Sequence, residues 1–159
     1  MKKFFQEELE TMETAKIKAV QEEKFLKQFK FVYGNNAYYR KLCDKKGVGL
    51  DDVKCMADIA KLPFLTKADL REAYPDGLLC KPLADCVRIQ STSGTTGKRV
   101  VAYYTQHDVD LWEECCARAI VAAGGTKEDV VQVAYGYGLF TGGAGLHGGS
   151  HKLGSLTLP

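Results

Sequence analysis

The sequence predicts an α/β protein in which a helical region over residues 1–85 is followed by the first strands and helices of a sheet-containing core over 86–159. Two observations support this division. Apolar residues before position 85 recur at spacings of three and four amid Lys and Glu, which is typical of amphipathic helices. From Cys86 onward, β-rich runs alternate with a helical segment and glycine-rich turns. A strand, a helix and a strand in this order predict a parallel pair joined by a crossover.

The helical region carries recognisable start and stop signals. A helix is expected over 36–46 and should end at Gly47, because glycine readily adopts the left-handed conformation that closes a helix. A third short helix is expected over 51–60, opened by one of two adjacent aspartates. Thr66 and Asp69 form a capping-box pattern that predicts the start of a fourth helix.

The core should open with two strands over 87–90 and 100–104, joined by the polar, glycine-containing loop 91–98. A capping-box pattern at Thr105 and Asp108 predicts a helix after the second strand. The helix is expected to place Trp112, Ala119 and Ile120 inward and to hold Cys115 in its core, with Gly124 and Gly125 at its end.

The rest of the core is expected to form one strand–helix–strand unit. The apolar run 130–134 predicts a strand buried on both faces. A glycine-rich turn then leads into a short helix near 143–153, and residues 156–158 begin another strand. Because that strand has barely started at Pro159, we expect the core to be truncated.

The composition excludes several classes of protein. A net charge of +2, with 45% hydrophobic and 26% charged residues, is ordinary for a globular protein and argues against a dedicated nucleic-acid binder. No stretch has the length and apolarity of a membrane span, and no signal peptide is expected. The 6 cysteines contain no C-x-x-C pair, which favours reduced thiols and the cytoplasm. The oligomeric state stays open, a homodimer included.

The loop between the first two strands has the chemistry of an anion site. Small residues let a backbone curl so that several N–H groups converge on one anion, and hydroxyls and a lysine add donors and charge. A polyphosphate is the expected guest. The loop does not fit the P-loop of kinases, since Arg99 stands where Ser or Thr should follow the lysine. The alternative is a flexible hairpin loop. The candidate residues are Ser91, Thr92, Ser93, Gly94, Thr95, Thr96, Gly97 and Lys98.

Read as S-T-S-G-T-T-G-K, the loop resembles the phosphate-binding signature of the acyl-adenylate-forming superfamily. The stretch D-V-V-Q-V-A-Y-G-Y-G-L-F-T-G-G over 129–143 is similar to phenylacetate–coenzyme A ligases, an AMP-binding family. Segments 62–71 and 74–78 are also similar to that family, and the resemblance runs from about Phe29 onward. Joint matching of this kind is far more specific than a lone glycine loop.

The resemblance implies a two-step reaction. A carboxylate attacks the α-phosphate of Mg-ATP to give an acyl adenylate and pyrophosphate, and the thiol of CoA then displaces AMP. The loop would hold the β- and γ-phosphates, with Thr95, Thr96 and Lys98 as its catalytic side chains. ATP, Mg²⁺ and CoA would be co-substrates. The family's magnesium, ribose and CoA elements have no counterpart before Pro159, so the chain is expected to be an N-terminal fragment that is inactive alone.

The aromatic stretch after 130–134 implies an aryl-acid substrate. Tyr135, Tyr137 and Phe140 would stack against a ring just past a strand's carboxyl end, where open α/β sheets place ligands. Gly142 and Gly143 would leave room for that ring. The alternative is that these aromatic residues pack in the core.

His147 and His151 stand four residues apart, a spacing that can hold a metal on a helix. No third ligand is evident, so no metal site is expected, and His147 is interpreted as support for the aryl pocket.

Two rival functions remain open. One is an adenylase of the same family with an acceptor other than CoA. The other is a non-catalytic module that binds only a nucleotide or a partner chain. ATP–pyrophosphate exchange separates them, because only an adenylase shows it.

Overall fold

The computed structural model describes residues 3–94 and 99–159. They form two compact units, Met12–Leu83 and Met1–Thr11 with Ala84–Pro159. The boundary lies close to the division expected at residue 85, although the first eleven residues group with the later part of the chain. No helix in the described ranges is long and apolar enough to cross a membrane.

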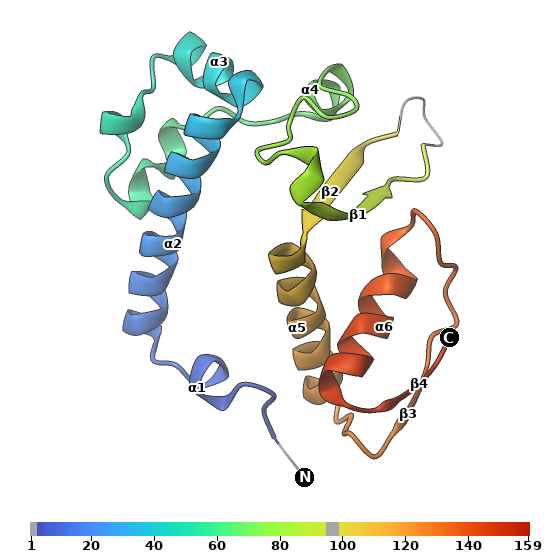
Figure 1. The fold of residues 1–159 in the computed structure, drawn as a ribbon. Coiled ribbons are helices and arrows are strands. Elements are labelled where there is room, and N and C mark those ends of the chain that lie inside the picture. Colours follow the sequence, from blue (N-terminus) through green and yellow to red (C-terminus); the bar gives the residue numbers. More distant parts are fainter. Residues whose placement is uncertain (1–2, 95–98) are drawn as a thin grey trace. The chain divides into compact units, whose positions relative to one another are not determined.

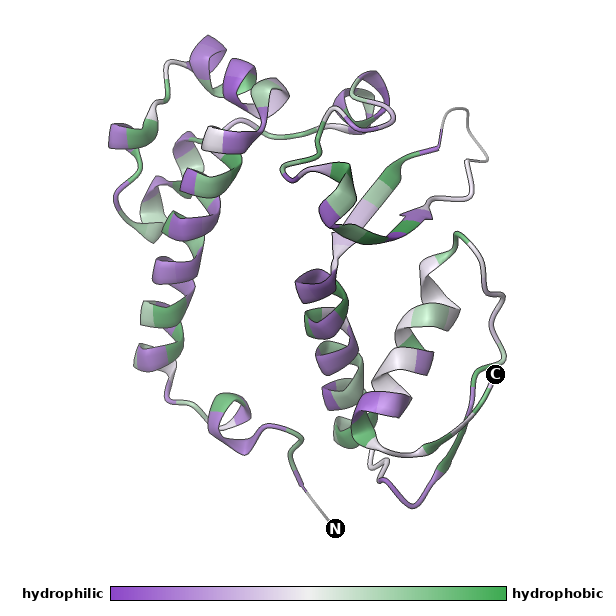
Figure 2. Cartoon of the chain, in the orientation of Figure 1, coloured by the Kyte–Doolittle hydropathy of each residue, from purple (hydrophilic) through white to green (hydrophobic). Residues whose placement is uncertain are grey.

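The unit Met12–Leu83 is built from helices (Figure 1). Its α-helices are α2 (Thr14–Asn35), α3 (Ala37–Lys46) and α4 (Lys67–Glu72), and its 3-10 turns are η1 (Leu50–Asp52) and η2 (Met56–Lys61). The core consists of Phe29 from α2, Cys43 from α3, and Val48 and Val53 that follow. Figure 2 shows purple and green residues alternating along α2, the pattern of a helix with one apolar face.

Local capping chemistry fixes where these helices begin and end. Asn36 accepts a hydrogen bond from the Tyr39 backbone N–H at 2.8 Å and so caps α3, which ends at Gly47 with φ 68°. The capping box of Thr66 and Asp69 opens α4 as expected. These predictions are confirmed.

The single short helix expected over 51–60 is wrong, because the segment forms the two 3-10 turns η1 and η2. The Asp58 carboxylate accepts hydrogen bonds from the backbone N–H groups of Lys54 and Cys55, at 2.8 and 3.1 Å. Since those two groups are then unavailable to a continuous helix, the chain starts a new turn at Met56.

The second unit contains the sheets, together with α1 (Glu7–Glu10). The turn η3 (Leu83–Asp85) leads into β1 (Cys86–Ser91), which pairs antiparallel with β2 (Val101–Thr105), with Ile89 opposite Tyr103. Helix α5 (Gln106–Ala122) follows through the predicted capping box of Thr105 and Asp108. The unit ends with β3 (Val130–Gln132), α6 (Thr141–Leu153) and β4 (Leu156–Leu158). β3 and β4 are parallel, as predicted.

Helices α5 and α6 lie side by side (Figure 1), and glycine makes their close approach possible. A Cβ added at Gly145 would lie 2.6 Å from the Trp112 ring, and one at Gly149 would lie 2.4 Å from Cys116 Cβ. Figure 2 shows α6 pale over most of its length, as expected of a helix rich in glycine.

Two expectations about burial in this unit are wrong. On α5, Ala119 and Cys115 are exposed, whereas Val109, Ala117 and Val121 are buried. The surface that α6 presents is made of glycines, so a small residue such as Ala117 fits closely against it. The strand expected over 130–134 is shorter than predicted, and Val130 is 62% exposed because β3 pairs with β4 alone among the described strands.

Candidate functional site

The glycine-containing loop starts where β1 ends. Thr95, Thr96, Gly97 and Lys98 lie outside the described residues. Thr92, Ser93 and Gly94 follow β1 without regular structure. Gly94 has φ 71°, in the left-handed region where a side chain would be strained, so glycine is required at this turn.

Hydrogen bonds across its base close the loop. The Thr92 backbone N–H donates to the Val100 carbonyl at 3.0 Å, and the Val100 N–H donates to Thr92 Oγ1 at 3.1 Å. Arg99 Nη1 donates to Oγ of the buried Ser91 at 3.3 Å. The two strands therefore remain tied together beyond their last ladder residues, and Arg99 places a guanidinium group at the foot of the predicted phosphate loop.

The foot of the loop contacts the aromatic segment that precedes α6. The Ser91 N–H donates to the Leu139 carbonyl at 2.8 Å. Gln90, which is 1% exposed, donates from Nε2 to the Phe140 carbonyl at 3.4 Å. Two segments that the sequence identified separately, about fifty positions apart, are therefore neighbours in the structure.

The three predicted aromatic residues lie around the start of α6. The rings of Tyr135 and Phe140 stack with centroids 6.2 Å apart and planes 11° from parallel. The Tyr137 hydroxyl lies 3.0 Å from His147 Nδ1, and the two rings meet edge to face. Exposed fractions of 58%, 46% and 50% for Tyr135, Tyr137 and Phe140 are far from those of core residues.

The neighbouring glycines make room for these rings. A Cβ at Gly142 would lie 3.1 Å from the Tyr135 ring and 3.3 Å from the Phe140 ring. A Cβ at Gly143 would lie 3.0 Å from the Gly136 carbonyl oxygen. The space at Gly142 and Gly143 is thus taken by this segment's own rings and backbone rather than by an open cavity.

His147 and His151 are neighbours on α6, with ring centroids 4.3 Å apart and planes tilted by 58°. Within residues 3–94 and 99–159, no group of three or more His, Cys, Asp and Glu side chains is arranged to hold a metal ion. His147 contacts Tyr137 through its Nδ1 and its ring edge.

Gln90 was missed in the sequence. A long polar side chain next to the apolar residues of a strand, directly before a glycine loop, is the signal that could have identified it. Burying such a group is costly unless it is hydrogen-bonded, so its presence there indicates a specific partner.

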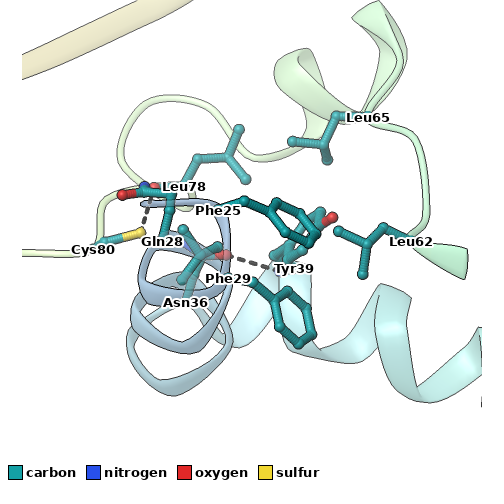
Figure 3. Close-up of a pocket in the computed structure, with 10 residues that line it drawn as sticks. Phe25, Gln28, Phe29, Asn36, Tyr39, Leu62, Leu65, Leu78 and Cys80 are labelled. Carbon is teal, nitrogen blue, oxygen red and sulfur yellow. Dashed lines mark hydrogen bonds between the residues drawn. The ribbon is translucent and has the colours of Figure 1, made fainter. Parts of the chain in front are cut away.

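The helical unit contains a separate cavity of about 400 Å³ (Figure 3). Its walls are mainly apolar, with Phe25, Phe29 and Leu62 among the lining residues. The polar groups at its edge are used internally, since Asn36 caps α3 and the Tyr39 hydroxyl donates to the Pro63 carbonyl at 3.3 Å. None of the predicted site residues lines this cavity.

No family model matches the sequence. Curated relatives do. The chain is 46% identical over 155 residues to the phenylacetate–coenzyme A ligase of Aromatoleum evansii, which covers 96% of this chain. It is 45% identical over 154 residues to that of Pseudomonas putida and 43% identical over 151 residues to that of Escherichia coli K12. In each case the chain spans only 35% of the relative's length.

Solved structures of 2-hydroxyisobutyryl-CoA ligase have a similar fold. One, in complex with 2-HIB-AMP and CoA, matches with a TM-score of 0.91 and 24% identity, covering 99% of this chain and 34% of that chain. An open conformation matches with a TM-score of 0.91 and 22% identity, covering 99% and 37%. At this identity the likeness establishes the fold alone. The chain thus has the fold of part of 2-hydroxyisobutyryl-CoA ligase, and in sequence it matches about one third of a phenylacetate–coenzyme A ligase.

Proposed function

We propose that this chain is the N-terminal part of an ATP-dependent aryl-acid–CoA ligase. The whole enzyme would convert phenylacetate, ATP and CoA to phenylacetyl-CoA, AMP and diphosphate through an acyl adenylate. Relatives that carry the name phenylacetate–coenzyme A ligase, at 42–46% identity, support this assignment. The fragment alone would be inactive, because it spans only 35% of those relatives.

The hydrogen bond from the Ser91 N–H to the Leu139 carbonyl carries the proposal. Adenylation requires the carboxylate of the acid to reach the α-phosphate of ATP. A loop that binds phosphates and a segment that binds the acid must therefore be adjacent. In this chain the foot of the predicted phosphate loop and the aromatic segment are joined directly.

The roles of the residues follow from this arrangement. The loop from Ser91 to Lys98 would bind the β- and γ-phosphates, with Thr95, Thr96 and Lys98 offsetting charge as pyrophosphate departs. Tyr135, Tyr137 and Phe140 would bind the aryl ring. We assign no residue of this chain to Mg²⁺ or CoA.

The test is ATP–pyrophosphate exchange by the full-length enzyme that contains this sequence, with phenylacetate, benzoate and hexanoate as acids. The double variant Thr95→Ala, Thr96→Ala should slow exchange by at least about a hundredfold, since losing a single transition-state donor already has that effect. Thr14→Ala, an exposed threonine at the start of α2, is the matched control and should match the wild type.

Each rival function gives a different result. Exchange with phenylacetate and formation of its CoA thioester would support the proposal. Exchange without a thioester would identify an adenylase with another acceptor. Absence of exchange with every acid would indicate a non-catalytic module and refute the proposal.

We also propose a cytoplasmic location. All six cysteines lie in the described ranges and are free thiols. Burial raises the pKa of the Cys43, Cys80 and Cys116 thiols, which keeps them protonated and unreactive. Reduced, unpaired cysteines are the usual state of a cytoplasmic enzyme.

A further inference from the structure

Gln90 has an environment that is unusual for its chemistry. It lies in β1 directly before the loop and is 1% exposed. Its Nε2 donates to the Phe140 carbonyl, while its buried Oε1 has no hydrogen-bond partner among residues 3–94 and 99–159. The orientation of the amide is fixed by this contact, because a flipped amide would bring two acceptor oxygens together.

An apolar side chain would cost less at this position. Leaving a buried oxygen unpaired is unfavourable, and an apolar residue of the same shape avoids that cost. A residue that lowers stability where packing alone would suffice indicates a role beyond stability. Among the described residues, the Phe140 carbonyl is the partner of the Gln90 side-chain amide.

The position of Phe140 connects this contact to the aryl ring. Phe140 directly precedes α6 in an extended conformation, with φ −80° and ψ 142°, and its ring stacks on Tyr135. Two consecutive residues of β1, Gln90 and Ser91, therefore hold the carbonyls of two consecutive residues, Leu139 and Phe140. The Gln90 contact, at 3.4 Å, is the longer of the two. Contacts of this kind often tighten only when the substrate is bound.

We propose that Gln90 is a positioning residue for the aryl acid: its amide holds the Phe140 carbonyl so that the Phe140 ring meets the substrate. This inference rests on the proposed function. Gln90 touches neither the acid nor the nucleotide in this scheme and acts only through Phe140. Replacing Gln90 should therefore weaken binding of the acid and leave binding of ATP unchanged.

The first test compares Michaelis constants in the exchange assay of the full-length enzyme. Gln90→Met removes the hydrogen-bond donor. The fold should persist, because methionine has a similar length and is readily buried. We expect KM for phenylacetate to rise about fivefold, the effect of one neutral hydrogen bond, and KM for ATP to stay within about twofold. Gln21→Met, the same change at an exposed position of α2, should alter neither constant.

The second test restores the donor by protonation. In Gln90→Glu, an ionised carboxylate cannot donate to the Phe140 carbonyl, whereas a protonated carboxyl can. Burial raises the pKa of such a group, so it should be protonated at about pH 6 and ionised at about pH 8. KM for phenylacetate in Gln90→Glu, divided by its value in Gln90→Met at the same pH, should therefore fall as the pH is lowered. A residue that only fills space would give a constant ratio.

Three results would overturn the inference while leaving the proposed function intact. They are an unchanged KM for phenylacetate in Gln90→Met, an equal rise in both Michaelis constants, and a pH-independent ratio for Gln90→Glu. A wild-type enzyme without exchange would instead refute the proposed function, and this inference would fall with it.

Discussion

Replacing Gly149 by alanine should loosen the contact between α5 and α6. The new Cβ would lie 2.4 Å from Cys116 Cβ, 2.9 Å from the Cys116 carbonyl carbon and 3.0 Å from the Ala117 backbone nitrogen. Non-bonded carbon atoms sit at about 3.5–4.0 Å. None of the three facing atoms can rotate away, because they belong to the α5 backbone or are bonded directly to it. The helices must therefore separate by about 1 Å.

The expected cost follows from two opposing contributions. Overpacking costs about 1–3 kcal/mol, and the upper end applies because the clash involves backbone. Alanine is favoured over glycine within a helix by about 1 kcal/mol. The net loss is about 2 kcal/mol, which corresponds to a fall of about thirtyfold in hydrogen-exchange protection.

Hydrogen exchange of the full-length enzyme measures this locally, since each segment reports its own opening. Protection of α5 and α6 should fall in Gly149→Ala. Gly34→Ala is the matched control, because Gly34 lies near the end of α2 and its added Cβ meets no atom within 4 Å. Protection of α2 should be unchanged or slightly higher in that variant. Equal protection of α6 in Gly149→Ala and the wild type would refute the packing argument.

Three further predictions concern single side chains. Phe140→Ala should raise KM for phenylacetate more than KM for hexanoate and leave KM for ATP unchanged. An equal rise in KM for both acids would place Phe140 outside the pocket. Ser150→Ala should destabilise the α6–β4 region by about 1–3 kcal/mol by removing the partner of the Thr157 hydroxyl, which hydrogen exchange would show and unchanged protection would contradict. Burial, with a hydrogen bond to Asp69, raises the pKa of Tyr38 to about 12. The contribution of the protonated Tyr38 hydroxyl to the free energy of unfolding should therefore be complete below about pH 10 and lost as the pH rises through about 12. Absorbance titration should show one tyrosine that ionises near pH 12, and this transition should be absent in Tyr38→Phe.

Local signals in the sequence were enough to place most helix ends. The capping pairs Thr66–Asp69 and Thr105–Asp108 and the stop at Gly47 depend on neighbours within four positions, and the structure confirms them. The break at Asp58 was missed because the aspartates at 51 and 52 already offered a start for one continuous helix through this segment. The Asp58 carboxylate decides between a break and a continuous helix by capturing the N–H groups before it.

The buried face of α5 could not be predicted from periodicity alone. Trp112 does face α6, where its ring lies against Gly145, but Cys115 and Ala119 were expected on the same side and are exposed. The partner helix presents glycines, and the small residue Ala117 is fully buried against them. The neighbouring helix therefore determines which side of α5 is covered, and this information lies about thirty positions further along the chain.

The same limit applies to the candidate site. Its two halves were identified by their residue types, but the contacts that join Gln90 and Ser91 to Leu139 and Phe140 depend on where α6 begins. The helix that begins there packs closely on α5, and this close approach requires glycine at position 149. If Phe140 binds the aryl acid as proposed, a shift of α6 by about 1 Å would displace that ring as well, and such a displacement can cost a factor of about a hundred in rate.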